Sequence, residues 1–404
     1  MINVKEKFCP LLIEFDYKVI NNASGQIVRA FWENVPEGEF APTIVCAKKD
    51  SPFKSKWPLY EYDSYPKLTR LGHGLRKTPF PDLANLPDMF WHLWGKNVLR
   101  HINTVLKENS FNYIHSVSCP MGASLVALEL KKRTGLPWIA QFHDPFIGNR
   151  SEPFRSQYFK KRFEKMEYEI AKNADFIIHT NNVIADAWNE RYGSMVEGKM
   201  KALPLSFNTV DLPERKEKKR GDIITISHIG EIYDSRSLKD IVDALSELLV
   251  ENPSLKNRIE FQLVGRVKQS EKDYIHLKLL DDMFVFVGLL PPDQLSSFYQ
   301  NADVFLALDI NTAQSPSYPS KLMMYYYYQK PILGITTPGS VMESDFKKSG
   351  HKYFYYGDKD GIKRYLINIL NEETNFTFDV NYWERFKVES AVSDYVKIVD
   401  KILK

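Results

Sequence analysis

The segment "FNYIHSVSCPMGASLVALELKKRTGLPWIAQFHD", residues 111–144, contains two short apolar runs separated by an amphipathic stretch. The runs at 111–117 and 137–144 have the length and composition of buried strands, and residues 121–135 have the apolar spacing of a helix. Two strands joined by a helix form a βαβ unit, whose strands lie parallel in one sheet. The segment therefore predicts an α/β fold with a doubly wound parallel sheet.

The same alternation continues along the chain on both sides of one polar interruption. Further strands are predicted at 175–180, 223–230, 259–265, 284–288, 303–309 and 330–335, and further helices at 162–174, 237–252, 291–302 and 381–404. The interruption, "SFNTVDLPERKEKKRGD", is charged and contains proline, as linkers often do. We therefore expect an N-terminal Rossmann-like domain at 1–205, a linker at 206–222 and a second Rossmann-like domain at 223–380.

The bulk composition excludes several classes of protein. A formal net charge of +3 is too small to indicate nucleic acid as the main partner. The three cysteines lie far apart, so neither a disulfide framework nor a zinc site is expected, which fits a reducing cytoplasm. No run is apolar and long enough for a membrane span or a signal peptide. The 13% of aromatic residues suits a sugar-binding protein or an aromatic core equally.

Ligands of open α/β sheets bind beyond the carboxyl ends of the strands. That rule selects Gly230, Glu231, Gly265, Arg266, Gly288, the 309–321 loop, His143 and Asp144. An imidazole at a strand end, such as that of His143, can hydrogen-bond a sugar hydroxyl or act as an acid or base. A purely structural histidine is the alternative.

The stretch "HIGEIYDSRSLKDIVDAL", residues 228–245, places an arginine at a helix start. The strand ends at Gly230 and the helix begins near Ser237, so Arg236 lies beside backbone N–H groups that have no helical partner. A guanidinium in that position is a suitable diphosphate clamp. A salt bridge within its own loop remains an equal alternative.

The stretch "SYPSKLMMYYYYQKPILGI", residues 317–335, predicts a second anion site. Pro319 favours a first helical turn, and Ser320 and Lys321 would project from it beside free N–H groups. Many helices begin in this way without a ligand. The tyrosines at 325–328 would cover every face of the helix, so packing explains most of them.

A third candidate lies near the N-terminus, in "YKVINNASGQIVRAF", residues 17–31. A strand-to-helix turn is expected at Asn22 to Gly25, where glycine permits a close approach of a ligand. Neither a full GxGxxG nor a Walker motif is present, which disfavours a dehydrogenase or a P-loop enzyme.

These motifs together resemble those of family 4 glycosyltransferases of the polysaccharide-assembly type. The similar segments are "GLPWIAQFHDPFIGN", "HIGEIYDSRSLKDIVDAL", "FQLVGRV", "FVFVGLLPPDQLSSFYQNADVFLAL" and "YPSKLMMYYYYQKPIL". They cover residues 110–345 well and residues 1–40 loosely. The resemblance implies a GT-B fold and the retaining, metal-independent transfer of a sugar. The donor would be a nucleotide sugar, and the acceptor a surface glycan or a lipid-linked saccharide.

The resemblance also implies roles for individual residues. Gly25 would lie near the donor phosphate, and His143, followed by Asp144, where donor and acceptor meet. The donor would be held by Gly230, Glu231, Arg236, Val287, Gly288, Pro319, Ser320, Lys321 and Leu322, with Arg236 on the diphosphate and 287–288 over the base. The final helix, 381–404, would cross back to the N-terminal domain.

The sequence departs from the family pattern at three positions. Two glutamates of the family would fall at Pro316 and Met324, and a usual Gly-Arg pair is Gly230-Glu231. Recognition of the donor sugar and ribose is therefore altered or weaker, unless Glu231 bonds a sugar or ribose hydroxyl. A catalytically silent nucleotide- or partner-binding subunit and a nucleotide-sugar 2-epimerase-like enzyme stay as alternatives.

Two basic and aromatic stretches, 48–96 and 153–169, could rest on an anionic membrane surface at the inner face of the cell membrane. A solvated acceptor loop explains them equally well. No cofactor and no metal is expected, because cations can neutralise a departing diphosphate.

Overall fold

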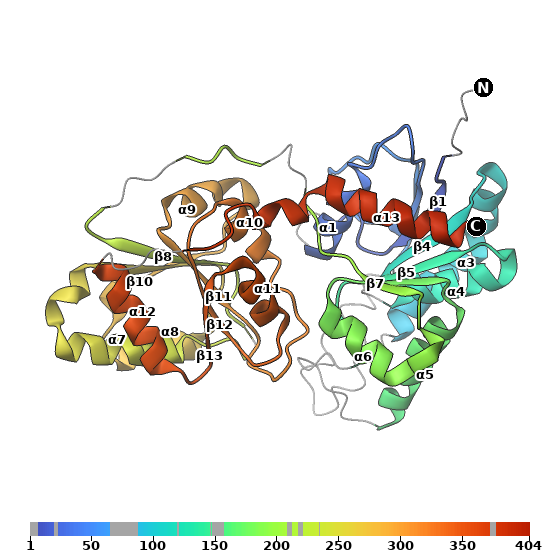
Figure 1. Cartoon of the computed structure of the whole chain (residues 1–404). Helices are drawn as coiled ribbons and strands as arrows, with labels where there is room; N and C mark the ends of the chain where they lie inside the picture. The colour runs from blue at the N-terminus through green and yellow to red at the C-terminus, as the bar shows by residue number, and fades with distance from the viewer. Residues whose placement is uncertain are drawn as a thin grey trace. The chain divides into compact units, whose positions relative to one another are not determined.

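The computed structural model describes residues 7–19, 23–64, 88–118, 121–145, 147, 157–207, 212–216, 221–233, 235–371 and 377–404. The chain forms two compact units, each built around its own parallel sheet (Figure 1). The N-terminal unit comprises Met1–Val210 and Arg385–Lys404, and the C-terminal unit comprises Asp211–Glu384. The expected linker at 206–222 is thus shared between the two units.

The sheet of the N-terminal unit has the strand order β3-β2-β1-β4-β5-β6-β7, with every adjacent pair parallel. The strands are β1 (Pro10–Glu14), β2 (Thr43–Ala47), β3 (Leu59–Tyr62), β4 (Tyr113–Ser118), β5 (Trp138–Phe142), β6 (Phe176–His179) and β7 (Met200–Ala202). The winding direction reverses between β1 and β4. Such a reversal is the place where doubly wound sheets bind ligands.

The helices of this unit connect the strands and cover the sheet. They are α1 (Ala23–Trp32), α3 (Asp88–Glu108), α4 (Gly122–Thr134), α5 (Gln157–Asn173), α6 (Asn182–Tyr192), the short η2 (Gly193–Met195) and α13 (Val388–Ile402). The C-terminal helix α13 packs on α1 and in the core beside β1, β2 and β4. Its buried residues are Val388, Ala391, Val392, Tyr395, Ile398 and Val399.

The sheet of the C-terminal unit has the order β10-β9-β8-β11-β12-β13, again parallel throughout. Its strands are β8 (Ile224–Ile229), β9 (Ile259–Val264), β10 (Phe284–Gly288), β11 (Val304–Leu308), β12 (Ile332–Thr336) and β13 (Lys352–Tyr355). Here the winding reverses between β8 and β11. The predicted α/β class with two doubly wound sheets is confirmed.

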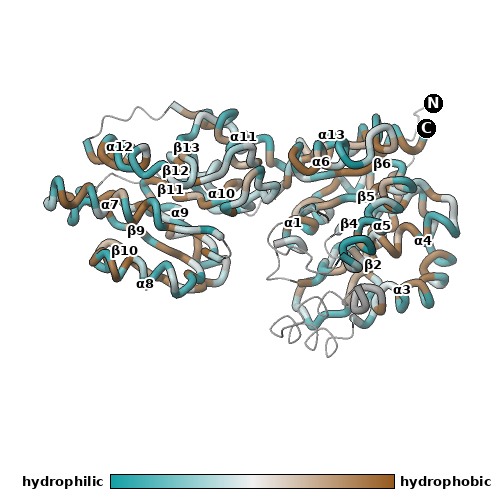
Figure 2. The backbone as a smooth tube through the Cα atoms, turned by 90° about the horizontal axis from the view of Figure 1, so that it is seen from below, coloured by the Kyte–Doolittle hydropathy of each residue, from teal (hydrophilic) through white to brown (hydrophobic). Residues whose placement is uncertain are grey.

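The helices of the C-terminal unit alternate with these strands. They are α7 (Lys239–Glu251), η3 (Pro253–Asn257), α8 (Gln269–Leu277), η4 (Asp281–Met283), η5 (Pro292–Gln294), α9 (Ser296–Asn301), α10 (Lys321–Tyr327), α11 (Val341–Ser349) and α12 (Lys359–Leu370), followed by η6 (Tyr382–Phe386). In Figure 2, α7 and α12 alternate between hydrophobic and hydrophilic colours along the tube. That alternation is typical of helices that bury one face.

Some predicted boundaries were wrong for local reasons. The helix expected over 291–302 is divided at Leu295 into the short η5 and α9. The helix expected at 237 begins at Lys239. In the preceding loop, Glu271 accepts from the Ser237 hydroxyl and from the Leu238 amide.

Candidate functional site

Three glycines occupy neighbouring strand ends of the C-terminal unit. Gly230, Gly265 and Gly288 follow or end β8, β9 and β10, and all have positive φ angles, of 139°, 127° and 83°. A Cβ on Gly265 would lie 2.4 Å from the carbonyl oxygen of Gly230, so only glycine fits there. The glycines therefore bring the backbone of adjacent strand ends into direct contact, without side chains above them.

A lysine lies over the first of these glycines. The Nζ of Lys321 would be 3.1 Å from a Cβ placed on Gly230, and it donates to Nε2 of His228 at 2.8 Å. The Nδ1 of His228 lies 3.0 Å from the carbonyl oxygen of Leu306, which only accepts, so the hydrogen of this imidazole is on Nδ1. His228 is fully buried and holds the lysine at the carboxyl edge of the sheet.

An arginine is buried at the same edge. Arg236 is only 6% exposed, its Nε donates to the carbonyl oxygen of Leu308 at 3.1 Å, and its guanidinium lies 4.5 Å from the ring centre of Tyr233. The Nη1 of Arg236 and the hydroxyl of Ser235 are buried without a hydrogen-bond partner among the described residues. A buried donor of this kind costs free energy unless a ligand satisfies it.

Neither cation has a counter-ion among the described residues. No ion pair involves Arg236 or Lys321 in the described part of the chain, although many surface lysines and arginines there are paired. Burial, reinforced by the charge of Arg236, lowers the pKa of Lys321 well below its ordinary value. Two adjacent, partly desolvated cations repel each other, and an anion between them would relieve both costs.

The helix starts contribute less than the sequence predicts. At α7 the amide of Leu238 donates to Glu271, and that of Lys239 to the hydroxyl of Ser237. At α10 the amide of Leu322 donates to the carbonyl of Pro319, and α10 begins only at Lys321. These N–H groups are already used, so the side chains of Arg236 and Lys321 carry the positive charge.

The remaining predicted donor residues lie at the same strand ends or close behind them. Gly288 has open space above it, and the neighbouring Val287 is half-buried. Pro319 and Leu322 are buried, whereas Ser320 is half-buried. Pro319, Ser320 and Leu322 are the chain neighbours of Lys321 and support its position.

Glu231 has a partner that the sequence did not indicate. Its two carboxylate oxygens accept from Nη2 and Nε of Arg266 at 2.9 and 3.1 Å. Each carboxylate oxygen accepts one hydrogen bond from Arg266 and keeps a second lone pair, so a sugar hydroxyl would share the carboxylate with Arg266.

The tyrosine run is core, as expected from its spacing. Tyr325 is fully buried, stacks on Phe305 at 4.2 Å, and its hydroxyl accepts from the amide of Ile229 at 2.8 Å. Tyr327 donates to the carbonyl of Pro213. Met324, at the position of an expected glutamate, is half-buried.

In the N-terminal unit, the predicted residues meet at the ends of β1 and β5. Gly25 lies inside the first turn of α1, not in the turn before it, and a Cβ there would lie 2.5 Å from the carbonyl oxygen of Asp16. Ser24 on the same turn lies 3.3 Å from Nδ1 of His143. His143 is half-buried, and burial lowers its pKa to about 4. Asp144 is exposed.

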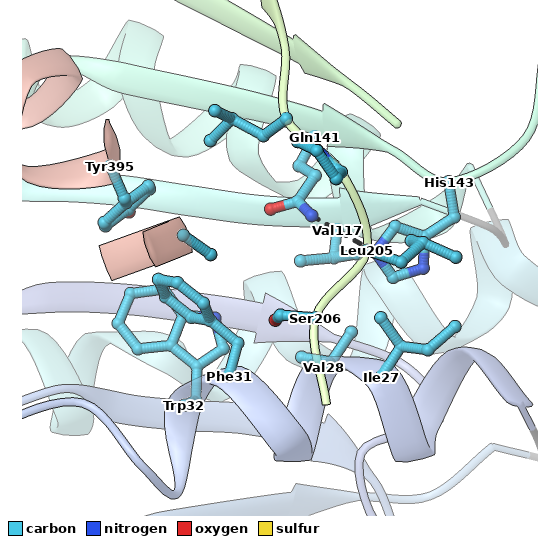
Figure 3. Close-up of a pocket in the computed structure, with 13 residues that line it drawn as sticks. Ile27, Val28, Phe31, Trp32, Val117, Gln141, His143, Leu205, Ser206 and Tyr395 are labelled. Carbon is cyan, nitrogen blue, oxygen red and sulfur yellow. Dashed lines mark hydrogen bonds between the residues drawn. The ribbon is translucent and has the colours of Figure 1, made fainter. Parts of the chain in front are cut away.

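A small cavity lies behind His143 (Figure 3). It has room for about 30 Å³ and is lined by Ile27, Val28, Phe31, Trp32, Val117, Gln141, His143, Leu203, Pro204, Leu205, Ser206, Ala391 and Tyr395. One water needs about 10–15 Å³ measured in this way, so the cavity suits a water or two and not a sugar. It is a narrow, partly open space beside His143.

Sequence reasoning missed His228, Tyr233 and Ser235. His228 and Tyr233 lie within the stretch quoted above for Arg236. The strand pattern there does not reveal that His228 contacts the side chain of Lys321. The described residues contain no group of three or more His, Cys, Asp or Glu side chains able to hold a metal ion. None of the helices in the described ranges is both long and apolar enough to cross a membrane.

Residues 34–209 match the model of Glycosyltransferase Family 4. No curated protein sequence matches the chain. Three similar solved structures have the same two-sheet fold over nearly their whole length. Sucrose-phosphate synthase from Thermosynechococcus elongatus has a TM-score of 0.70 at 13% identity, with 98% of this chain and 99% of that chain covered.

The second structure is Anabaena Alr3699/HepE in complex with UDP and glucose, with a TM-score of 0.65, 13% identity and coverage of 98% and 100%. The third is the lipopolysaccharide outer core galactosyltransferase WaaB in its apo form, with a TM-score of 0.62, 15% identity and coverage of 97% and 99%. At these identities the structures establish the fold alone, which is GT-B. Together with the family match over residues 34–209, they support the resemblance of this chain to family 4 glycosyltransferases.

Proposed function

We propose that this family 4 glycosyltransferase moves a sugar from a nucleotide-sugar donor to a surface-glycan or lipid-linked saccharide acceptor, with retention of the anomeric configuration. The observation that carries the proposal is the pair of uncompensated cations, Arg236 and Lys321, beside side-chain-free strand ends. A diphosphate has the charge and the acceptor oxygens that this arrangement lacks. The Anabaena protein of the same fold was solved with UDP and with UDP-glucose.

The role of the two cations follows from the chemistry of the leaving group. When the bond between the anomeric carbon and the diphosphate breaks, negative charge grows on the diphosphate oxygens. Arg236 and Lys321 would stabilise that charge at fixed positions, which is the main catalytic contribution expected of such a site. They supply positive charge that a metal supplies in other enzymes, so no metal is proposed.

Retention has a geometric consequence for the acceptor. Without a protein nucleophile, the acceptor oxygen must approach the sugar on the face from which the diphosphate departs. A diphosphate oxygen can then take the proton of the acceptor hydroxyl while the new glycosidic bond forms. The protein's remaining task is to orient the two substrates.

The lipid-linked acceptor class is supported by helix α5. Lys160, Lys161, Arg162 and Lys165 are exposed on this helix, with Tyr158 and Tyr168 exposed at 67% and 41%. Basic and aromatic side chains on one helix suit the surface of an anionic membrane. Binding of the full-length chain to vesicles of anionic lipid, compared with vesicles of neutral lipid, tests this contact.

A donor screen tests the nucleotide-sugar site. A ligand that binds the native state raises its stability, so the correct donor should raise the melting temperature of the full-length protein. UDP-, GDP-, ADP- and dTDP-sugars form the panel. Arg236→Gln should strongly reduce the shift, whereas Arg266→Gln should keep it, because Arg266 is exposed and paired with Glu231. A panel without any stabilising nucleotide sugar would reject the proposal.

A catalytically silent subunit remains the second candidate. It is favoured by Pro316 and Met324, which stand where the family has glutamates. Such a subunit would bind a nucleotide in the same screen and would not consume the donor. The 2-epimerase-like alternative would convert the donor without any acceptor.

A further inference from the structure

A chain of hydrogen bonds runs through the N-terminal unit from α13 to the end of β5. The Tyr395 hydroxyl lies 2.5 Å from Nδ1 of His115, and Nε2 of His115 lies 2.9 Å from Oε1 of Gln141. The Nε2 of Gln141 lies 3.2 Å from Nε2 of His143, whose Nδ1 lies 3.3 Å from the Ser24 hydroxyl. Figure 3 shows Gln141 with its oxygen toward Tyr395 and its nitrogen toward His143.

The order of donors and acceptors along this chain determines both tautomers. The Gln141 oxygen only accepts, so Nε2 of His115 carries a hydrogen, and Nδ1 of a neutral His115 accepts from Tyr395. The Gln141 amide nitrogen only donates, so Nε2 of His143 accepts. A neutral His143 then carries its hydrogen on Nδ1, on the side of Ser24.

Both imidazoles are neutral near pH 7. Burial lowers the pKa of His115 to about 3 and that of His143 to about 4. A neutral imidazole has one donor and one acceptor nitrogen. The role of one ring nitrogen therefore fixes the role of the other, and the order of donors and acceptors continues through each ring.

The hydroxyl of Tyr395 decides the direction of the hydrogen bonds along the chain. Its single hydrogen has two possible acceptors, Nδ1 of His115 at 2.5 Å and the hydroxyl of Tyr113 at 3.2 Å. The geometry of the 3.2 Å contact lets Tyr395 donate to Tyr113, so the two acceptors compete for one hydrogen. With the hydrogen of His115 on Nε2, the nearer acceptor Nδ1 needs a donor, and Tyr395 supplies it. If Tyr113 took it instead, Nδ1 of His115 would have to donate, the Gln141 amide would rotate, and His143 would carry its hydrogen on Nε2.

The chain is rigidly held. The Tyr395 ring is buried among aromatic rings, with centroids at 5.3 Å from Phe31, 5.6 Å from Trp32 and 5.4 Å from His115. Among the described residues, His179 in the same unit is buried with both ring nitrogens unpaired. Histidine burial alone therefore does not produce such a chain.

We propose that Tyr395 is a positioning residue that, through His115 and Gln141, fixes the hydrogen of His143 on Nδ1. His143 then directs its N–H toward the Ser24 hydroxyl, where a hydroxyl or ring oxygen of a sugar would replace Ser24 as the acceptor, and does not act as a base. The choice of a sugar oxygen rests on the proposed function. The assignment of the tautomers does not.

Histidine side-chain NMR of the full-length protein tests the tautomers directly. With ¹⁵N-histidine labelling, the nitrogens of His143 should show a protonated Nδ1 and a bare Nε2, and those of His115 the reverse. The signals are assigned with His115→Gln and His143→Gln. A wild-type protein with a protonated Nε2 on His143 would overturn the proposal.

Tyr395→Phe keeps the ring and removes the hydroxyl. Without a donor at Nδ1, the two tautomers of His115 become similar in energy, because either face of the Gln141 amide can satisfy Nε2. The single Nδ1-protonated signal of His143 should then be lost in favour of a mixture, while His179 is unchanged. An unchanged His143 in this variant would contradict the proposal.

Two matched variants separate the chain from general packing. Tyr113→Phe removes only the longer contact and should leave His143 as in the wild type; a flipped tautomer would show that Tyr113 holds the hydrogen. Gln141→Glu has acceptors at both ends and should move a hydrogen onto Nε2 of His143. An unchanged tautomer of His143 in Gln141→Glu would contradict the proposal.

The same measurement separates this inference from the proposed function. If no nucleotide sugar binds, the tautomers can still be as stated. Only the sugar oxygen is then excluded as the partner of His143. If the donor binds and the tautomers are mixed in the wild type, the glycosyltransferase proposal stands and Tyr395 has no such role.

Discussion

At the scale of single residues, the donor site that we propose in the C-terminal unit rests on two cations that have no ion-pair partner among the described residues. Arg236 has a buried Nη1 without a partner, and Lys321 is held by a neutral histidine where a carboxylate would be the ordinary choice. Buried charges usually have a partner of opposite sign. The described residues provide none here, which indicates that the partner is a ligand.

Removing the arginine should weaken donor binding strongly. A hydrogen bond to a charged group contributes about 1.5–3 kcal/mol, so Arg236→Gln should lower the affinity for the donor about 10- to 100-fold. Calorimetric titration with the donor found in the screen measures this loss. Arg266→Gln is the control at an exposed arginine. Equal affinities of both variants would contradict the assignment of Arg236.

The lowered pKa of Lys321 gives a pH dependence with a defined sign. Its ammonium loses its proton at a lower pH than an ordinary lysine. Donor affinity should therefore fall as the pH rises through this lowered pKa, and binding above it should take up a proton, seen in buffers of different ionisation enthalpy. Lys321→Gln should remove this part of the dependence. Without donor, the same shift makes the fold more stable as pH rises from the lowered pKa toward 10.5.

At the scale of elements, the strand ends and the helix behind them decide whether the site can form. β8, β9 and β10 end in glycines with positive φ, and α10 places Lys321 above the first of them while its tyrosines fill the core. The short helix is thus anchored by packing, not by its own hydrogen bonds.

The glycine contact can be tested by adding one methyl group. Gly265→Ala would put a Cβ 2.4 Å from the Gly230 carbonyl, at a φ that alanine rarely adopts. The variant should lose donor binding and melt at a lower temperature. Gly221→Ala, whose Cβ meets nothing closer than 4.0 Å, is the matched control in the same unit and should behave as the wild type.

One hydroxyl links α10 to the end of β8. The Tyr325 hydroxyl accepts from the Ile229 amide and donates to the Leu306 carbonyl. Tyr325→Phe leaves these buried groups unsatisfied and should cost about 1–3 kcal/mol in free energy of unfolding. Denaturant unfolding measures the loss. The exposed Tyr168→Phe should change stability by less than about 0.5 kcal/mol, and an equal effect of both would refute this role of Tyr325.

At the scale of the whole molecule, sequence periodicity predicted the two sheets well and the site only in part. Apolar strand runs and their intervening helices leave little freedom of architecture, and Arg236 was identified from its place beside a predicted helix start. The pairing of Glu231 with Arg266, the occupied amides before α7 and the role of His228 depend on contacts between distant residues, which spacing does not reveal. Gly25 was expected in the turn before the helix, whereas α1 already begins at Ala23.

The C-terminal helix completes the N-terminal unit although it comes last in the chain. A fully buried aliphatic or aromatic side chain contributes about 1.5–3 kcal/mol, and α13 buries several of them. A chain that ends before Val388 should therefore lose hydrogen-exchange protection in β1, β2 and β4 while β8, β9 and β11 stay protected. Retained protection in β4 would show that the unit folds without α13.

The central claim is glycosyl transfer from a nucleotide sugar held by Arg236 and Lys321. Its most direct test is the release of nucleoside diphosphate, measured with each donor of the panel in the presence of saccharide and lipid-linked acceptors. The account predicts release from one class of donor, acceptor-dependent, with a product whose anomeric configuration equals that of the donor, and loss of release in Arg236→Gln but not in Arg266→Gln. Donor binding without any release, in the wild type as in Arg236→Gln, would contradict it and identify a silent subunit.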